Sequence, residues 1–138
     1  MKYDMCHICV GHQHLLLEVS LIHKIISPPP ITPIPLTPSH VSGLINVRNE
    51  VIVVVHLGKL LNLPTTNQQQ ILIIHHNEEK LGLLFDAVLS FEQLTETIQP
   101  YLEAEVPTSI QPYISGVLGR KRIPVLTPDK IILGESSL

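Results

Sequence analysis

The sequence contains no tryptophan and few other aromatic residues, and this shortage limits the kind of core it can form. Aromatic residues make up 4% of the 138 residues, whereas hydrophobic residues make up 44%. The core must therefore consist of Ile, Val and Leu, and the β-branched members of that set favour a pleated sheet over a helix. Twelve prolines also count against a helical bundle, because proline removes a backbone donor and clashes inside a helix. We expect an all-β domain with short helices.

A basic surface and a long apolar run are also missing. The net charge is −3 and the only basic cluster is Arg120, Lys121 and Arg122, so we do not expect nucleic-acid binding, which needs many cations to neutralise phosphates. No apolar run approaches the roughly 20 residues that cross a bilayer, and the N-terminus lacks the apolar region of a signal peptide. The two cysteines fit a reducing compartment. These features predict a cytoplasmic protein without membrane insertion.

Short apolar runs separated by turn residues dominate the pattern along the chain. They predict strands over residues 2–10, 13–18, 43–47, 51–55, 71–74, 81–88, 113–118 and 123–126. Short helices are expected over residues 57–61 and 92–98, and from residues 127–128 to residue 133. Residues 27–38 hold six prolines and must run extended. Many short strands in two similar halves point to small barrels within one domain.

A cluster of Cys and His residues near the N-terminus is a candidate metal site. Its members are Cys6, His7, Cys9, His12 and His14. Thiolate and imidazole are the ligands that zinc prefers. The spacing is poor, however, because a structural CxxC normally lies on a turn and these residues lie on a predicted strand with alternating faces. We favour a structural role for the cluster and keep a metal site as the alternative.

Catalytic motifs are not evident in the sequence. There is no GxSxG elbow and no glycine-rich phosphate loop. The aspartates Asp4, Asp86 and Asp129 lie far apart, so no nucleophile, base and carboxylate fall into a recognisable pattern. We therefore expect a protein without enzymatic activity.

The strongest pattern is a hairpin over residues 43–56, with a turn at Arg48 and Asn49. Asn tolerates a positive φ and serves where Gly would in such a turn. Arg48 then has two interpretations of equal weight. Either it is a solvent-facing residue at a hairpin tip, or its planar guanidinium group binds carboxylates or carbonyls of a partner.

Several short motifs, in order along the chain, carry a family resemblance. Residues 43–49 read GLINVRN, which is similar to G-V-I-N-L-R-G, and residues 81–88 read LGLLFDAV, which is similar to V-G-L-L-V-D-x-V. Together with shorter matches between residues 5 and 133, they resemble the CheW family of adaptors, which join CheA-type histidine kinases to chemoreceptors. Each motif is short and mostly apolar, so the ordered set is the specific feature.

The resemblance implies a fold, partners and contact residues. The fold is two intertwined five-stranded SH3-like barrels that share a hydrophobic core, one over about residues 16–86 and the other from the remainder of residues 1–138. The implied partners are the regulatory domain of a CheA-type kinase and the cytoplasmic tip of a chemoreceptor, and no cofactor is implied. The protein-binding residues carried over by position are Ile22, Lys24, Ile25, Gly43, Asn46 and Arg48.

Three residues depart from the family pattern. Lys24 stands where the family usually has Glu, Asn49 replaces the turn Gly, and His56 replaces the Asp of V-D-L. These changes suggest a divergent member. They keep open two alternatives to kinase–receptor coupling, namely a regulatory paralogue that binds another protein and a small metal-binding barrel.

Overall fold

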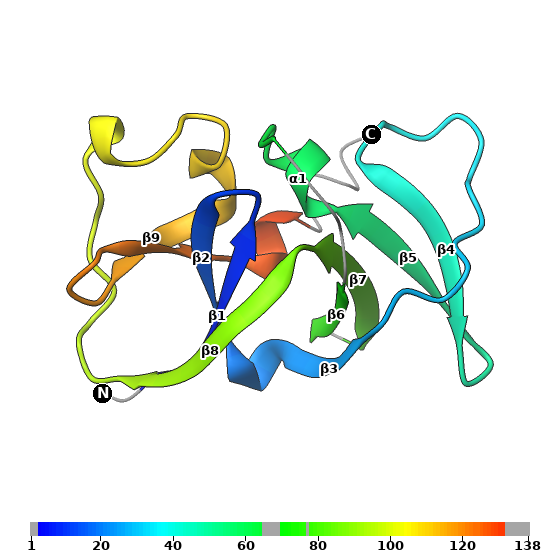
Figure 1. Ribbon diagram of the computed structural model, residues 1–138, viewed down its shortest axis with the longest axis horizontal. Coiled ribbons are helices and arrows are strands. Elements are labelled where there is room, and N and C mark those ends of the chain that lie inside the picture. Colours follow the sequence, from blue (N-terminus) through cyan, green and yellow to red (C-terminus); the bar gives the residue numbers. More distant parts are fainter. Residues whose placement is uncertain (1–2, 65–69, 77, 132–138) are drawn as a thin grey trace.

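The structure, a computed structural model, describes residues 3–64, 70–76 and 78–131 (Figure 1). Within these residues the strands are β1 (Tyr3–Val10), β2 (Gln13–Glu18), β3 (Ile22–Ile26), β4 (Val41–Val47), β5 (Glu50–His56), β6 (Gln70–His76), β7 (Glu79–Phe85), β8 (Ala87–Leu94), β9 (Ile114–Leu118) and β10 (Ile123–Leu126). The helices are short: α1 (Leu57–Leu60), the 3-10 helices η1 (Val19–Leu21), η2 (Glu103–Glu105) and η3 (Gln111–Tyr113), and a helical turn over residues 128–131. The expected all-β class is confirmed.

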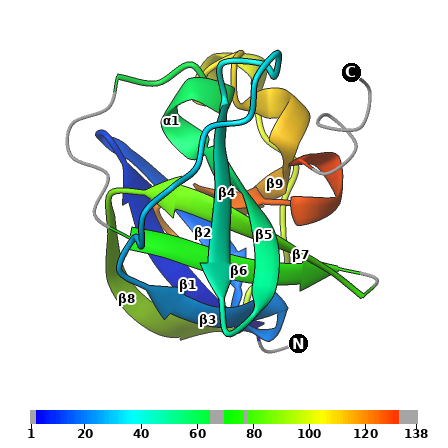
Figure 2. The same ribbon diagram turned by 90° about the vertical axis from the view of Figure 1, so that its right-hand side faces the viewer.

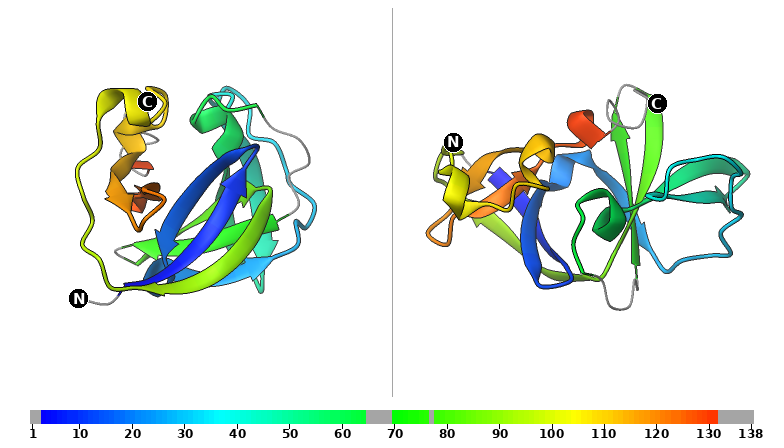
Figure 3. Two further views of the ribbon diagram at one scale, coloured as in Figure 1. Left: turned by 60° about the vertical axis from the view of Figure 1, so that its left-hand side comes forward. Right: turned by 90° about the horizontal axis from the view of Figure 1, so that it is seen from above.

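The strands form two five-stranded sheets that lie side by side along the long axis of the molecule (Figures 1 and 3). One sheet contains the first two and the last two strands of the chain, and we call it the terminal sheet; its order is β8-β1-β2-β10-β9. The other contains strands from the middle of the sequence, and we call it the central sheet; its order is β3-β6-β7-β5-β4. Each sheet has one parallel pair, β2 with β10 and β5 with β7, while its other pairs are antiparallel. The chain starts in the terminal sheet, builds the whole central sheet and then returns to the terminal sheet at β8. The two sheets are therefore intertwined.

One buried cluster spans both sheets. It contains Leu15 and Leu17 of β2 together with Leu72 of β6 and Phe85 of β7, all fully buried. Between β7 and β8 lies a single residue, Asp86, whose carboxylate accepts a hydrogen bond of 3.1 Å from the backbone N–H of Gly11 in the β1–β2 turn. The shared core and this bond tie the return point of the chain to the first hairpin.

Two sequence-based expectations were wrong around residues 81–98. The predicted single strand over residues 81–88 is split by Asp86 into β7 and β8. The helix predicted over residues 92–98 is instead the end of strand β8 followed by a loop, because β8 pairs with β1 as far as Leu94 opposite Tyr3. A ladder of backbone hydrogen bonds to a distant strand outweighs the helical propensity of Glu, Gln and Leu. The expected terminal helix begins at Pro128, and its predicted end lies outside the described residues.

Gly43 in β4 allows the proline-rich segment to lie against the central sheet. Its φ is +145°, and a Cβ atom at this position would lie 2.2 Å from the carbonyl oxygen of Thr32. Thr32 and Leu44 exchange two backbone hydrogen bonds, of 2.9 Å and 2.8 Å, beside this contact. The close approach of these two segments of the chain requires the absence of a side chain at residue 43.

Replacing Gly43 with Ala should destabilise the protein. We expect a loss of about 2–4 kcal/mol in the free energy of unfolding, from backbone strain and from a methyl group that has no space. Urea denaturation measures it. Gly119→Ala is the matched control, since φ is +82° there but the nearest atom to a new Cβ would be 3.9 Å away. Equal losses for the two variants would contradict the role of the Thr32 contact.

Candidate protein-binding site

The six residues expected to bind partners all lie in the central sheet, in two groups. Ile22, Lys24 and Ile25 lie on β3, whereas Gly43, Asn46 and Arg48 lie on β4 and its turn. Strands β3 and β4 are the two edge strands of this sheet, and Thr32 covers part of the outer edge of β4 through its bridge to Leu44. Edge strands expose backbone groups on one side and are common docking elements.

The β3 group is only partly exposed. Ile22 and Ile25 pack against the shared core, while Lys24 is half-buried and His23 is exposed. The register with β6 shifts between Ile22 and Lys24, which is the mark of a bulge. The apolar residues of this group therefore serve the core as well as the surface.

The β4–β5 turn presents Arg48 in a fixed backbone conformation. The φ angles of Arg48 and Asn49 are +50° and +68°, and Val47 pairs with Glu50 across them, which makes a two-residue type I′ turn. The backbone N–H of Asn49 donates a 3.1 Å hydrogen bond to Oδ1 of Asn46. Asn49 thus preserves the turn that Gly forms in the family pattern. Arg48, Asn46 and Asn49 are all exposed.

An ion pair connects the surroundings of the two groups. Nζ of Lys80 donates a 2.8 Å hydrogen bond to Oε1 of Glu50, which follows the Arg48–Asn49 turn. This hydrogen bond is the main cause of the lowered pKa of Glu50, to which His23 and Lys24 also contribute. Conversely, Lys80 is the main cause of the lowered pKa of His23.

The charges of β3 therefore act on the start of β5, at the end of the central sheet that carries the Arg48 turn. We call this region the hairpin-end patch, made of His23, Lys24, Asn46, Arg48, Asn49, Glu50 and Lys80. It is cationic, with three permanently charged basic side chains and one carboxylate. The sequence pattern pointed to Lys24 and Arg48 but gave no signal for the Lys80–Glu50 pair, which joins residues 30 positions apart.

The N-terminal Cys and His residues form a different arrangement from a metal site. The Cys6 thiol is buried in the core, which raises its pKa to about 11. His7 of β1 bonds through Nε2 to Nδ1 of His14 at 2.8 Å and through Nδ1 to Oε2 of Glu92 at 3.2 Å. Among the residues that the structure describes, no group of three or more His, Cys, Asp or Glu side chains is arranged to hold a metal ion.

Glu92 also accepts a 3.0 Å hydrogen bond from the hydroxyl of Ser90, so serine, histidine and a carboxylate come together here. Their order differs from that of a catalytic triad. In a triad the serine hydroxyl donates to the histidine, whose other nitrogen bonds the acid. Here the serine bonds the acid, and Nε2 of His7 is taken by His14. The arrangement does not activate Ser90 as a nucleophile.

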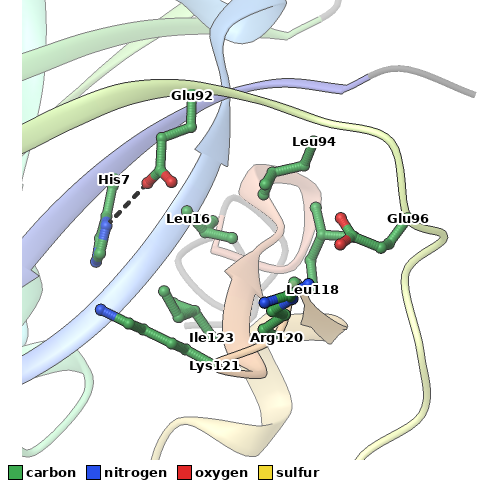
Figure 4. A pocket seen from close by; sticks show the side chains of 10 residues that line it. His7, Leu16, Glu92, Leu94, Glu96, Leu118, Arg120, Lys121 and Ile123 are labelled. Atoms are coloured by element: carbon green, nitrogen blue, oxygen red, sulfur yellow. Dashed lines mark hydrogen bonds and ion pairs between the residues drawn. The ribbon is translucent and has the colours of Figure 1, made fainter.

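A cavity of about 300 Å³ lies beside this network (Figure 4). Leu16, Leu94 and Leu118 form part of its wall, and Lys121 points toward His7 in Figure 4. Its charged lining residues are of both signs, with Glu92 and Glu96 facing the same space as the basic residues. The sequence gave no sign of Glu92, because it lies 85 residues from His7 and falls in the segment expected to be helical.

His56 caps helix α1. Its Nδ1 accepts a hydrogen bond of 3.2 Å from the backbone N–H of Lys59, and its own backbone is extended, as an N-cap residue requires. The departure from Asp at this position therefore keeps a cap. The cap depends on a neutral imidazole, however, and burial, followed by the charge of Lys59, lowers the pKa of His56 below 6.5.

This cap predicts a pH-dependent contribution to stability. Because the pKa of His56 is lower in the folded protein than in the unfolded chain, the unfolded state takes up the proton first. The contribution is complete above the unfolded pKa of about 6.5 and is lost as the pH falls below it, through the lower pKa of the folded protein. Urea denaturation over this pH range should show that the free energy of unfolding of His56→Asn depends less on pH than that of the wild type. Asn caps the helix without titrating. His12→Asn, at an exposed histidine, is the control, and identical profiles for wild type and His56→Asn would contradict the account.

Two intertwined five-stranded sheets around a common core define an SH3-like class of protein. The sequence model of the CheW-like domain family matches residues 4–134 of the chain. The chain belongs to the CheW family. This confirms the family and the SH3-like fold expected from the ordered motifs.

Two relatives illustrate the similarity. The chain is 30% identical over 97 residues to the chemotaxis protein CheW of Thermotoga maritima, a match that covers 69% of this chain and 64% of that protein. The match therefore spans a little less than two thirds of that relative's length. The structure of the scaffolding protein TtCheW from Thermoanaerobacter tengcongensis superposes with a TM-score of 0.80 at 24% identity, covering 92% of this chain and 88% of the other. In the part of the chain that the structure describes, no helix is long and apolar enough to cross a membrane.

Proposed function

We propose that this chain is a non-catalytic, cytoplasmic adaptor that couples a CheA-type histidine kinase to chemoreceptors. The observation that carries the proposal is the CheW-like domain over residues 4–134. The names of the two relatives, a chemotaxis protein and a scaffolding protein, support a role in assembling other proteins. The order of the Ser90, Glu92 and His7 bonds gives no support to a hydrolase.

The hairpin-end patch is the surface we assign to the kinase. Arg48 is held at a positive φ by a two-residue turn, so its Cα–Cβ bond leaves the surface in a set direction. A guanidinium binds carboxylates and carbonyls in a planar, two-pronged geometry. Glu50 already pairs with Lys80, which leaves Lys24 and Arg48 as the charges that favour an acidic partner surface.

The receptor tip is assigned to the region between the two barrels, taken as about residues 16–86 and the remainder of the chain. The core shared by the two sheets supports this assignment, because a coupling protein requires both of its docking faces on one rigid body.

A second candidate is a regulatory paralogue that binds a different protein. The observation that favours it is Lys24, which adds a positive charge near Glu50 where the family usually has a carboxylate. Such a reversal changes which partner charges are attracted and which are repelled. The neighbouring genes discriminate the two candidates, since a paralogue would lie apart from kinase and receptor genes.

Replacing Arg48 with Ala should weaken binding to the regulatory domain of a CheA-type kinase by about tenfold, or about 1.4 kcal/mol, while the domain stays folded. Isothermal titration calorimetry at low and high salt measures this. Arg120→Ala removes the same charge from an exposed turn of the terminal sheet and should leave the affinity unchanged. An unaltered affinity for Arg48→Ala would remove Arg48 from the contact. No complex with the wild-type chain at tens of micromolar would count against the adaptor itself.

A further inference from the structure

The cavity of about 300 Å³ shown in Figure 4 belongs to the terminal sheet, and the proposed kinase contact does not use it. Leu16 of β2 and Leu118 of β9 are buried and give it an apolar wall, which Leu94 and Ile123 extend. Its volume is at the lower end of the range of about 300–1,000 Å³ for small-molecule sites. The cavity therefore suits a small molecule with an apolar part.

Charged side chains of both signs line the same cavity from different parts of the chain. The carboxylates belong to Glu92 of β8 and Glu96 of the loop after it, whereas the cations belong to Arg120 and Lys121 of the β9–β10 turn. Among the residues that the structure describes, no hydrogen bond or ion pair joins these acids to these cations. Both kinds of charge are therefore available to a ligand.

The carboxylate of Glu92 is held in place by its neighbours. Its Oε2 accepts hydrogen bonds from Nδ1 of His7 at 3.2 Å and from the hydroxyl of Ser90 at 3.0 Å. Within the described part of the chain, neither of these bonds uses Oε1. A carboxylate that is fixed through one oxygen offers the other to a ligand with little further loss of side-chain entropy. His7 and Ser90 are therefore positioning residues for Glu92.

The fold does not require a histidine beside the cavity, because the central sheet repeats the strand arrangement of the terminal sheet (Figures 1 and 2). His7 of β1 pairs with Leu16 of β2, which is the neighbour of β10. In the same way, Ile73 of β6 pairs with Gly82 of β7, which is the neighbour of β5. His7 thus has the position of Ile73, which is fully buried in the central sheet.

Glu92 also replaces an apolar residue of the other sheet. It pairs with Met5, two residues before His7, as Ile26 pairs with Ile71, two residues before Ile73. Ile26 packs against the buried cluster of the central sheet. The terminal sheet thus carries a histidine and a carboxylate where the same arrangement elsewhere in the chain has two isoleucines. Polar residues at positions that the fold fills with apolar ones are a sign of function.

We propose that this cavity binds a free aliphatic α-amino acid, which is a small zwitterion with an apolar side chain. A simple anion would meet the carboxylates of Glu92 and Glu96, and a simple cation would meet Arg120 and Lys121. An α-amino acid satisfies both, since its ammonium binds the carboxylates and its carboxylate binds the cations. Its side chain then lies against the apolar wall. This binding goes beyond the proposed kinase coupling and does not rest on it.

The test titrates the ¹⁵N-labelled full chain with L-leucine and follows the chemical shifts. We expect saturable changes at residues 92–96 and 118–123 with a Kd of about 0.1–1 mM. Three analogues each lack one feature of the ligand: leucinamide has no carboxylate, 4-methylpentanoate has no ammonium, and glycine has no side chain. Each of them should bind about tenfold more weakly than L-leucine.

Two charge-removing variants separate recognition from a structural role. Lys121→Gln should weaken L-leucine and 4-methylpentanoate about threefold and leave leucinamide unchanged, because only the first two carry a carboxylate. Glu96→Gln should weaken L-leucine and leucinamide about threefold and leave 4-methylpentanoate unchanged, because only the first two carry an ammonium. Lys59→Gln, at an exposed residue of α1 outside the cavity, is the control and should bind all three as the wild type does.

Several outcomes would overturn the proposal. They are the absence of saturable shifts up to about 20 mM L-leucine, shifts away from the cavity, analogues that bind as tightly as L-leucine, and equal weakening of all ligands by either variant. The kinase titration contains no amino acid, so its Arg120→Ala control tests the kinase contact alone. Failure of the amino-acid titration therefore leaves the kinase contact untouched, and failure of the kinase contact leaves the cavity untouched.

Discussion

The apolar layer between the two sheets is the interaction on which the rest of the structure depends. Neither sheet is continuous in sequence, because the chain leaves the terminal sheet after β2 and returns to it only at β8. The layer joins Leu15 and Leu17 from the first part of the chain to Leu83 and Phe85 from the middle. Each such side chain contributes about 1.5–3 kcal/mol on burial. Because aromatic residues are scarce, many interlocking Ile, Val and Leu side chains provide this stability.

A core of this kind tolerates strain at the surface. Leu36, Arg48 and Asn49 all have positive φ angles in exposed turns of the central sheet. For residues other than Gly and Asn, this conformation costs about 1–2 kcal/mol. The burial of a single core side chain offsets such a cost. The strained turns place an arginine after one end of β4 and a leucine before the other end.

The parts of this structure that depend on neighbours in sequence could be predicted, and the parts that depend on distant residues could not. Most of the strands and the Arg48–Asn49 turn follow from alternation and turn chemistry, which are local, although no strand was predicted over β3. Strand β8 was missed because its pairing with β1 is decided by residues at the other end of the chain. For the same reason nothing indicated the Lys80–Glu50 pair or the bond between His7 and Glu92. Gly43 was expected on the partner-binding surface, but its contact with Thr32 emerges only when the proline-rich segment lies on the sheet.

The central claim is that this chain bridges two other proteins, and co-sedimentation of a CheA-type kinase with receptor-bearing membranes tests it most directly. The kinase, the membranes and this chain are combined, and the chain is left out of a parallel sample. The account predicts that the kinase sediments with the membranes in an amount that rises with the concentration of the chain and then saturates. Equal sedimentation of the kinase with and without the chain would contradict it.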